Sequence, residues 1–193
     1  MAKFKLLIYD LDGTLVDTAE DITRSINFML AEFDKPKRDR KEVSAFVGLG
    51  VFHLVQNVLG EKDPKVVEKA IKIYRGHYAK HMLDTSRLFP GAAEFLKHFR
   101  SRKQAVITNK PNPYSKDILI GLGVADYFVE IIAGDSPYPK NPIPRDFWPS
   151  LSAKRYCPAR PCLSGTARWM CKPVKGPGRP RLYSLMDFRG WMK

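Results

Sequence analysis

The stretch LLIYDLDGTLVDT, residues 6–18, decides the fold class of this 193-residue chain. Residues 4–9 predict a buried strand, and Asp10 and Asp12 follow at its carboxyl end, where open α/β sheets place their ligands. Two carboxylates this close repel each other unless a cation neutralises them or one is protonated. One can then act as a nucleophile and the other as a general acid and base.

The same Asp-x-Asp-Gly pattern also occurs in calcium-binding loops and in plain turns, because Asp and Gly are common turn residues. A calcium loop would continue with alternating acidic or amide ligands, whereas here the pattern follows a buried strand. The catalytic interpretation is therefore favoured over the calcium loop.

Hydrophobic residues recur at helical spacing through residues 18–83, as in Ile22, Ile26 and Met29. Strand patterns return at residues 104–108 and 127–135, with helical segments before and between them. This order predicts an α/β fold: a truncated Rossmann-like parallel sheet, formed by residues 1–17 and 84–140, with an inserted small α-helical cap domain at 18–83. Residues 141–193 are predicted to form an irregular tail.

The net charge of +13 is concentrated in that tail. Residues 1–140 contain 22 Lys and Arg against 18 Asp and Glu, whereas residues 141–193 contain 11 against 2. The tail also holds all three Trp and all three Cys, and the spacing of Cys157, Cys162 and Cys171 matches no zinc signature. Whole-chain charge is therefore a poor indication of a nucleic-acid partner, and the sequence argues against one.

The first apolar run, at residues 6–9, is too short for a membrane span or a signal peptide. Residues 1–140 contain no Cys, so nothing indicates a disulfide scaffold. We expect a cytoplasmic protein without a membrane partner. The sequence carries no indication of its oligomeric state.

Several motifs resemble those of one enzyme family. IYDLDGTLVDT, residues 8–18, closely resembles the first motif of the haloacid dehalogenase superfamily, and VITNK, residues 106–110, resembles its second motif. FVGLG at 46–50, LFPGAAEFL at 88–96 and GDSPYPK at 134–140 are similar to the phosphoglycolate phosphatase branch. The resemblance covers residues 1–140, and the helical insert matches the family's small cap.

The resemblance implies a role for each matching residue. Asp10 would attack phosphorus to form an aspartyl phosphate and would also bind Mg²⁺, and Asp12 would act as the general acid and base and give its main-chain carbonyl to the metal. Thr108 and Asn109 would hold the phosphoryl oxygens, with Lys140 as a third phosphate-binding residue. Lys110 is a second choice, because an exposed lysine near a helix start is usually just solvated.

Two family elements are missing as written. The third motif, a Lys directly before Pro-x-Pro, is replaced by NPIP at 141–144, with Lys140 one place early. The fourth motif, which supplies further acidic Mg²⁺ ligands, has no counterpart, because Asp146 and Asp187 are the only acidic residues after Lys140 and neither ends an apolar strand. A chain without that motif is expected to have little activity.

Both motifs return when the tail is translated in another frame. Joining the third base of each codon to the first two of the next forces Asp at Trp169–Met170 and Val at Met170–Cys171. Over residues 163–171 this frame permits Val-Gly-Asp-Ser-Glu-Val-Asp-Val, and over 140–144 it permits Lys-Pro-Asp-Pro. The tail is therefore interpreted as a frameshifted C-terminal half of the family domain, with the shift near codon 140.

The sequence as a whole predicts a Mg²⁺-dependent phosphatase that hydrolyses a small phosphorylated metabolite, with 2-phosphoglycolate as the first substrate to test. A phosphosugar mutase of the same superfamily would use the same two aspartates. A non-catalytic protein with a basic, nucleic-acid-binding tail is the alternative from another class.

Overall fold

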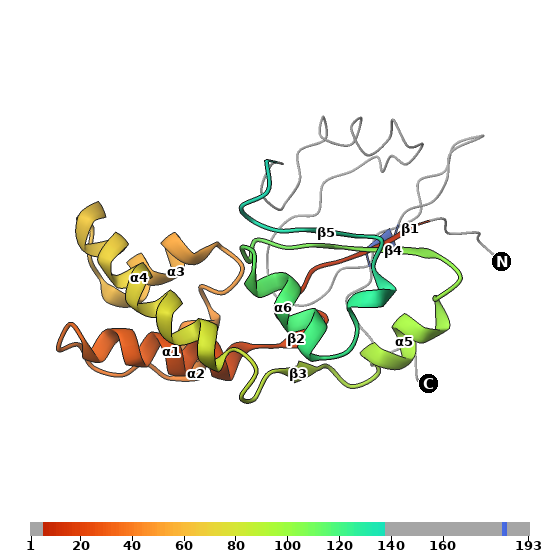
Figure 1. Cartoon of the computed structure of the whole chain (residues 1–193). Coiled ribbons are helices and arrows are strands. Elements are labelled where there is room, and N and C mark those ends of the chain that lie inside the picture. Colours follow the sequence, from red (N-terminus) through yellow and green to blue (C-terminus); the bar gives the residue numbers. More distant parts are fainter. Residues whose placement is uncertain (1–5, 138–182, 185–193) are drawn as a thin grey trace. The chain divides into compact units, whose positions relative to one another are not determined.

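The computed structural model describes residues 6–137 and 183–184. The chain forms two compact units: a helical unit, Val16–Leu88, and a core unit made of the segments 1–15 and 89–193. The residues predicted to form the cap, 18–83, all lie in the helical unit. Figure 1 shows the helical unit as one continuous stretch of the chain inserted after β1.

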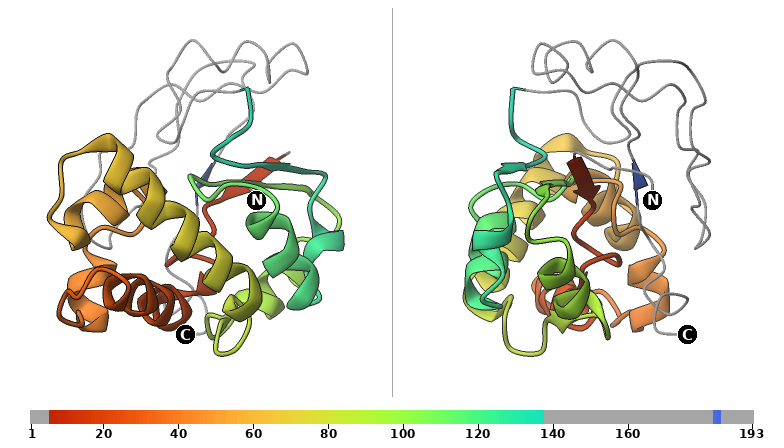
Figure 2. Two further views of the ribbon diagram at one scale, coloured as in Figure 1. Left: turned by 60° about the vertical axis from the view of Figure 1, so that its left-hand side comes forward. Right: turned by 90° about the vertical axis from the view of Figure 1, so that its right-hand side faces the viewer.

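The core unit contains a sheet with the strand order β5-β4-β1-β6. Its strands are β1 (Leu6–Tyr9), β4 (Lys103–Ile107), β5 (Glu130–Ile132) and β6 (Tyr183–Ser184), and each neighbouring pair is parallel. Helices α5 (Ala92–His98) and α6 (Tyr114–Gly121) lie on the same side of β1, β4 and β5 in both Figure 1 and Figure 2. The predicted α/β fold with a parallel sheet is confirmed.

Strand β1 lies in the interior of the core unit. Leu7 and Tyr9 are no more than 1% exposed, because β1 has a neighbouring strand on each edge and α5 packs against it through Phe95. The Tyr9 hydroxyl donates a hydrogen bond to Gln104 Oε1 at 2.7 Å, so this buried polar group is satisfied. A central strand held in this way gives a rigid support to the residues that follow it.

The third predicted strand is shorter than the sequence pattern suggests. The pattern covers residues 127–135, but Ala125–Tyr127 forms a 3₁₀ helix and only Glu130–Ile132 pairs with β4. Apolar alternation extends beyond the ladder because Phe128 contacts the Tyr9 ring without taking part in the sheet. Residues after Ile132 leave the sheet and turn toward the end of β4.

The helical unit consists of α1 (Ala19–Ala31), α2 (Arg40–Ser44), α3 (Val51–Leu59) and α4 (Pro64–His81). Its core is made of apolar residues at helical spacing, all at most 9% exposed: Ile22, Ile26, Met29, Leu30, Leu54, Val55, Val58, Leu59, Val67, Ile71, Tyr74 and Tyr78. Asp63 caps α4 and Pro64 occupies its first turn, a position where a missing N–H costs nothing. The helical periodicity of the sequence is therefore matched by buried faces.

Two short strands close the helical unit. β2 (Val16–Asp17) and β3 (Arg87–Leu88) pair antiparallel at the two ends of the unit. Asp17 also forms an ion pair with Arg40 at 2.7 Å. No sequence pattern indicates this two-residue ladder, because so short a pairing has no periodicity.

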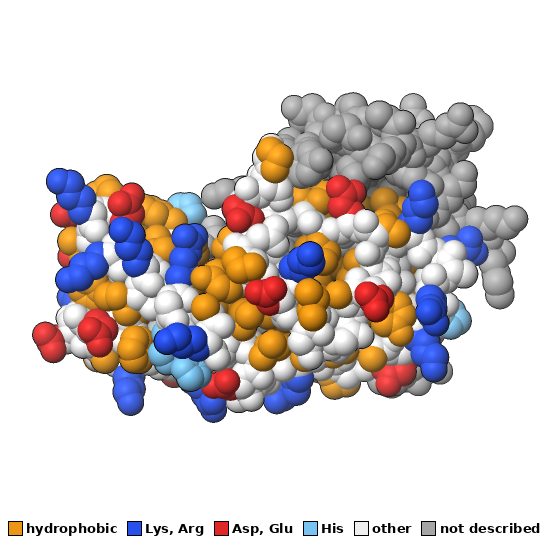
Figure 3. All heavy atoms as spheres, in the orientation of Figure 1, with side chains coloured by type: hydrophobic (Ala, Val, Ile, Leu, Met, Phe, Trp, Pro, Cys, Tyr) orange, Lys and Arg blue, Asp and Glu red, His pale blue; other side chains and the backbone are white. Residues whose placement is uncertain are grey.

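Of the tail 141–193, only Tyr183 and Ser184 are described, and their main chain forms β6 beside Leu7 and Ile8 of β1. The rest of the predicted irregular tail lies outside the described residues. Within the described ranges, no helix combines the length and the apolar character needed to span a membrane. On the face drawn in Figure 3, the described residues present both Lys and Arg side chains and Asp and Glu side chains.

Candidate active site

Asp10 and Asp12 lie directly after the last residue of β1. Asp10 Oδ1 accepts the N–H of Leu11 at 2.8 Å, and the N–H of Leu15 donates to the carbonyl of Leu11 at 3.0 Å. Gly13 has a φ of 75°, a conformation that glycine adopts without steric cost. The strand end and the tight turn together fix both carboxylates at the carboxyl edge of the sheet.

Thr108 and Asn109 follow β4, the neighbour of β1, so they reach the same edge of the sheet. Thr108 is only 3% exposed, and its side chain hydrogen-bonds to Asp10. The hydroxyl of Thr108 also accepts the N–H of Lys110 at 3.2 Å. Asn109 is half-buried between them in the chain. The structure therefore brings Thr108 into direct contact with the Asp10 carboxylate.

Lys110 is the residue that sequence reasoning placed wrongly. Its Nζ donates to both carboxylate oxygens of Asp12, at 3.0 and 3.2 Å, and the two side chains are only 6% and 10% exposed. The expectation of a solvated lysine near a helix start is therefore wrong. The sequence did contain a signal that Lys110 belongs to the site: it follows a buried strand and a Thr-Asn pair. Residues in that position lie at the ligand edge of a parallel sheet.

The two aspartates have different electrostatic surroundings. Burial and the neighbouring charge of Asp12 raise the pKa of Asp10 to about 6, although the Leu11 N–H, the Thr108 hydroxyl and the Lys110 ammonium act in the opposite direction. Asp12 accepts two hydrogen bonds from the Lys110 ammonium, whereas Asp10 accepts the Leu11 N–H and is hydrogen-bonded to the Thr108 hydroxyl, both of them neutral groups. The negative charge of Asp10 is therefore less fully compensated than that of Asp12, and a cation would stabilise it.

Carboxylate oxygens are the donors that Mg²⁺ prefers, and Mg²⁺ often binds through one or two carboxylates while keeping several waters. Asp10 and Asp12 fit that limited role. Within residues 6–137 and 183–184, however, no group of three or more His, Cys, Asp or Glu side chains forms a metal centre. Among the described residues, Asp10 and Asp12 could therefore hold a Mg²⁺ ion, and no third carboxylate joins them in a metal-binding group. Lys140, the third predicted phosphate-binding residue, lies outside the described residues.

Comparison with known proteins gives the family. The model of the family described as haloacid dehalogenase-like hydrolase matches residues 7–149. The chain therefore belongs to the haloacid dehalogenase-like hydrolase family. The matched range contains both aspartates and the segment Thr108–Lys110.

Similar proteins carry one recurrent name. The chain is 33% identical to the phosphoglycolate phosphatase of Thiobacillus denitrificans over 183 residues, covering 91% of this chain and 81% of that protein. It is 36% identical over 153 residues to the phosphoglycolate phosphatase of Yersinia pseudotuberculosis, covering 75% of this chain and 66% of that protein. The chain thus spans about two thirds to four fifths of these relatives.

A solved structure shares the fold. The crystal structure of a predicted phosphoglycolate phosphatase from Haemophilus somnus superposes with a TM-score of 0.74 at 29% identity, covering 80% of this chain and 72% of that one. The chain is therefore similar to this protein in its fold as well as in its sequence.

Proposed function

We propose that this chain derives from a phosphatase that hydrolyses a small phosphate monoester, with 2-phosphoglycolate as the first candidate. The observation that carries the proposal is the cluster of Asp10, Asp12, Thr108 and Lys110 at one edge of the parallel sheet. The name shared by the relatives supports the choice of substrate. A cytoplasmic location stays a proposal that rests on the cysteine-free segment 1–140.

In this proposal Asp10 is the nucleophile. One carboxylate oxygen of Asp10 attacks phosphorus, the bond between phosphorus and the ester oxygen breaks, and Asp12 donates a proton to the leaving alcohol. Asp12 then takes a proton from water, whose oxygen attacks the phosphorus of the aspartyl phosphate and releases inorganic phosphate and Asp10. Asn109 would donate hydrogen bonds to the phosphoryl oxygens, and Thr108 would donate its one hydroxyl proton to a phosphoryl oxygen in place of Asp10.

Lys110, the second choice for a phosphate contact in the sequence, is given that role in this proposal. Its ammonium donates to both carboxylate oxygens of Asp12 in the structure described. The arriving phosphoryl group carries negative charge and would compete with Asp12 for the same ammonium. Lys110 would then stabilise the phosphoryl oxygens.

Mg²⁺ would be held by a carboxylate oxygen of Asp10 and the main-chain carbonyl of Asp12. When bound, it supplies positive charge that offsets the negative charge gathered between Asp10 and the phosphoryl group. Because the described residues provide no third carboxylate, we propose that hydrolysis by the chain as written is strongly impaired.

The test is a screen of small phosphate esters, with and without Mg²⁺, on two proteins: this chain and a version whose reading frame is restored after codon 140. We expect Mg²⁺-dependent release of inorganic phosphate from the restored chain, greatest with 2-phosphoglycolate. Absence of phosphate release from every ester by the restored chain would refute the proposal. Analysis of the products formed from a phosphosugar separates hydrolysis from the mutase alternative, because a mutase returns an isomeric phosphosugar instead of phosphate.

A further inference from the structure

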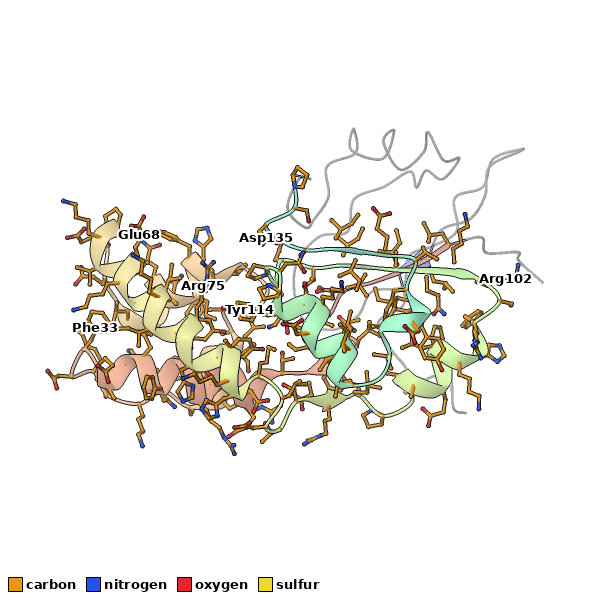
Figure 4. All side chains as sticks on the ribbon, viewed as in Figure 1. Phe33, Glu68, Arg75, Arg102, Tyr114 and Asp135 are labelled. Carbon is orange, nitrogen blue, oxygen red and sulfur yellow. The ribbon has the colours of Figure 1, made fainter. Side chains whose placement is uncertain are left out.

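The loop that follows β4 is attached to the segment that follows β5. Residues 108–112 form the first, which contains Thr108, Asn109 and Lys110, and residues 132–135 form the second. Three hydrogen bonds join them, all with donor–acceptor distances of 2.9–3.0 Å: Thr108 N–H to the Ile132 carbonyl, Gly134 N–H to the Lys110 carbonyl, and Asn112 N–H to Asp135 Oδ1. In Figure 4, Asp135 lies beyond the end of β5, on the side where Tyr114 marks the start of α6.

Gly134 lies against the main chain of Asn109. A Cβ atom at this position would lie 2.2 Å from the carbonyl oxygen of Asn109, 2.6 Å from its carbonyl carbon and 3.0 Å from its Cα. These are main-chain atoms, so no side-chain rotation can relieve the clash. Gly134 does not have a positive φ, and its requirement for glycine is therefore one of space rather than of backbone conformation.

The atoms that Gly134 touches belong to the loop that carries the site. Asn109 stands between Thr108, which hydrogen-bonds to Asp10, and Lys110, which pairs with Asp12. A shift of the Asn109 main chain would therefore move both neighbours relative to the aspartates. Geometry errors of about 1 Å at a reacting centre can cost on the order of 10²-fold in rate.

We infer that Gly134 and Asp135 are positioning residues, which hold the main chain of residues 108–110 at the place where Thr108, Asn109 and Lys110 can contact a phosphoryl group. The inference rests on the proposed function, because that function makes a phosphoryl group the ligand of residues 108–110. Gly134 acts by lacking a side chain, and Asp135 acts by accepting the Asn112 N–H. Neither residue touches the substrate.

The experiment compares Gly134→Ala with Gly76→Ala in the 193-residue chain. Gly76 lies within α4, and a Cβ there meets nothing within 4 Å, so Ala at 76 is the matched control. The amide ¹H–¹⁵N signals of Asn109 and Lys110 report the loop, and titration with inorganic phosphate in the presence of Mg²⁺ reports binding. We expect Gly134→Ala to shift both amide signals and to weaken phosphate binding roughly tenfold or more, with neither change in the control.

A second pair of variants covers the case in which Gly134→Ala does not fold. Asp135→Ala removes the acceptor of the Asn112 N–H, whereas Asp135→Asn keeps an oxygen that can accept it. We expect the Ala variant to displace the Lys110 and Asn112 amide signals and to weaken phosphate binding, and the Asn variant to restore both.

Two outcomes separate the inference from the function on which it rests. If the unaltered chain does not bind inorganic phosphate, the proposed phosphate site of this chain fails, and the amide signals alone decide the positioning role. The inference would be overturned if the Asn109 and Lys110 amide signals of Gly134→Ala did not differ from those of the unaltered chain. It would also be overturned if Asp135→Ala and Asp135→Asn had identical Lys110 and Asn112 amide signals. Unchanged phosphate affinity in a variant with displaced signals would overturn it as well.

Discussion

Asp10 and Asp12 are the same residue type two positions apart, but their neighbours give them different properties. Asp12 contacts the Lys110 ammonium, whereas Asp10 contacts the Leu11 N–H and the Thr108 hydroxyl. Ionisation of Asp10 in the folded chain therefore carries an electrostatic cost. That cost can be measured as stability, without any turnover.

Asp10→Asn should stabilise the chain at alkaline pH. The pKa of Asp10 is about 6 in the folded chain, above its ordinary value, so its favourable contribution is complete below pH ~4 and is lost as the pH rises through 6. In the absence of metal, we expect the variant to have an unfolding free energy about 3 kcal/mol higher than that of the unaltered chain at pH 8, and nearly the same value near pH 4. Urea unfolding at the two pH values measures this. A variant that is less stable at pH 8 would contradict it.

Asp10→Asn should also abolish any phosphate release by the frame-restored chain, since an amide is a poor nucleophile and a poor Mg²⁺ ligand. The measurement is release of inorganic phosphate from 2-phosphoglycolate, alongside circular dichroism to confirm an unchanged fold. Turnover equal to that of the unaltered restored chain would exclude Asp10 as the nucleophile.

Lys110→Met should destabilise the core unit, because it leaves the nearly buried carboxylate of Asp12 without its ammonium partner. Breaking a buried pair from one side costs about 2–4 kcal/mol, after allowance for the residual exposure of Asp12. Lys116→Met is the control, since Lys116 is exposed on α6 of the same unit and its replacement should change stability by less than about 0.5 kcal/mol. Equal effects of the two replacements on urea unfolding would show that the Asp12 pair contributes nothing.

At the scale of elements, hydrogen bonds to the Asp21 side chain connect the start of α1 to Thr85 and Ser86, the residues before β3. Its carboxylate accepts the N–H groups of Thr85 and Ser86 and both of their hydroxyls, at 2.6–3.1 Å. Burial raises the pKa of Asp21, but these hydrogen bonds outweigh burial and hold the pKa below its ordinary value. One side chain thus joins the two ends of the helical unit, next to the β2–β3 ladder.

Asp21→Ala should lower the unfolding free energy by about 2–4 kcal/mol at pH 7, because four donors lose a charged acceptor. Since the pKa of Asp21 is depressed on folding, its contribution is present above the ordinary carboxyl range and disappears as the pH falls through the folded-state pKa. The difference between variant and unaltered chain should therefore shrink below pH 4. Thermal unfolding across this pH range tests both statements.

The control for this prediction is Glu20→Ala, at the neighbouring position of α1. Glu20 pairs with Arg24, but the two side chains are 40% and 51% exposed, and exposed pairs of this kind contribute at most about 0.5 kcal/mol. A loss at Glu20→Ala as large as that at Asp21→Ala would show that the effect belongs to helix α1 in general.

At the scale of the whole molecule, the frameshift hypothesis concerns residues 141–193. The family match ends at residue 149, and the match to the Thiobacillus enzyme, which covers 91% of this chain, reaches further into the tail. The shifted frame permits the fourth motif over residues 163–171, whereas the chain as written has no counterpart of it. Determination of the gene's nucleotides around codon 140 tests the frameshift directly. A stop codon in the shifted frame, or the absence of its Gly-Asp-Ser string, would end the hypothesis.

The frame-restored chain should release phosphate at least about 10²-fold faster than the chain as written, because loss of one electrostatic component of an active site typically costs that much. The two proteins are compared in one assay with 2-phosphoglycolate, over a range of Mg²⁺ concentrations. Equal rates would mean that residues 141–193 as written already supply what the reaction needs.

Much of the local structure could be predicted because it depends on neighbouring residues. Short apolar runs identified β1 and β4, the helical period of 3.6 identified the helices of the helical unit, and the pair Asp10 and Asp12 was predicted to lie at the ligand edge of the sheet. The predicted third strand was too long, because a hydrophobic pattern records burial, and Phe128 is packed against Tyr9 without pairing in the ladder.

The resemblance to the family, the fold class and the importance of Asp10 and Asp12 could be predicted without coordinates, because each is encoded within a short run of residues. The pairing of Lys110 with Asp12, 98 positions away, and the lack of room for a side chain at Gly134 beside Asn109 became visible only in three dimensions. Residues so far apart in the chain meet only after parallel strands align, and no local pattern records that contact. Burial and ion pairing depend on distance in space, which the sheet sets and sequence spacing does not.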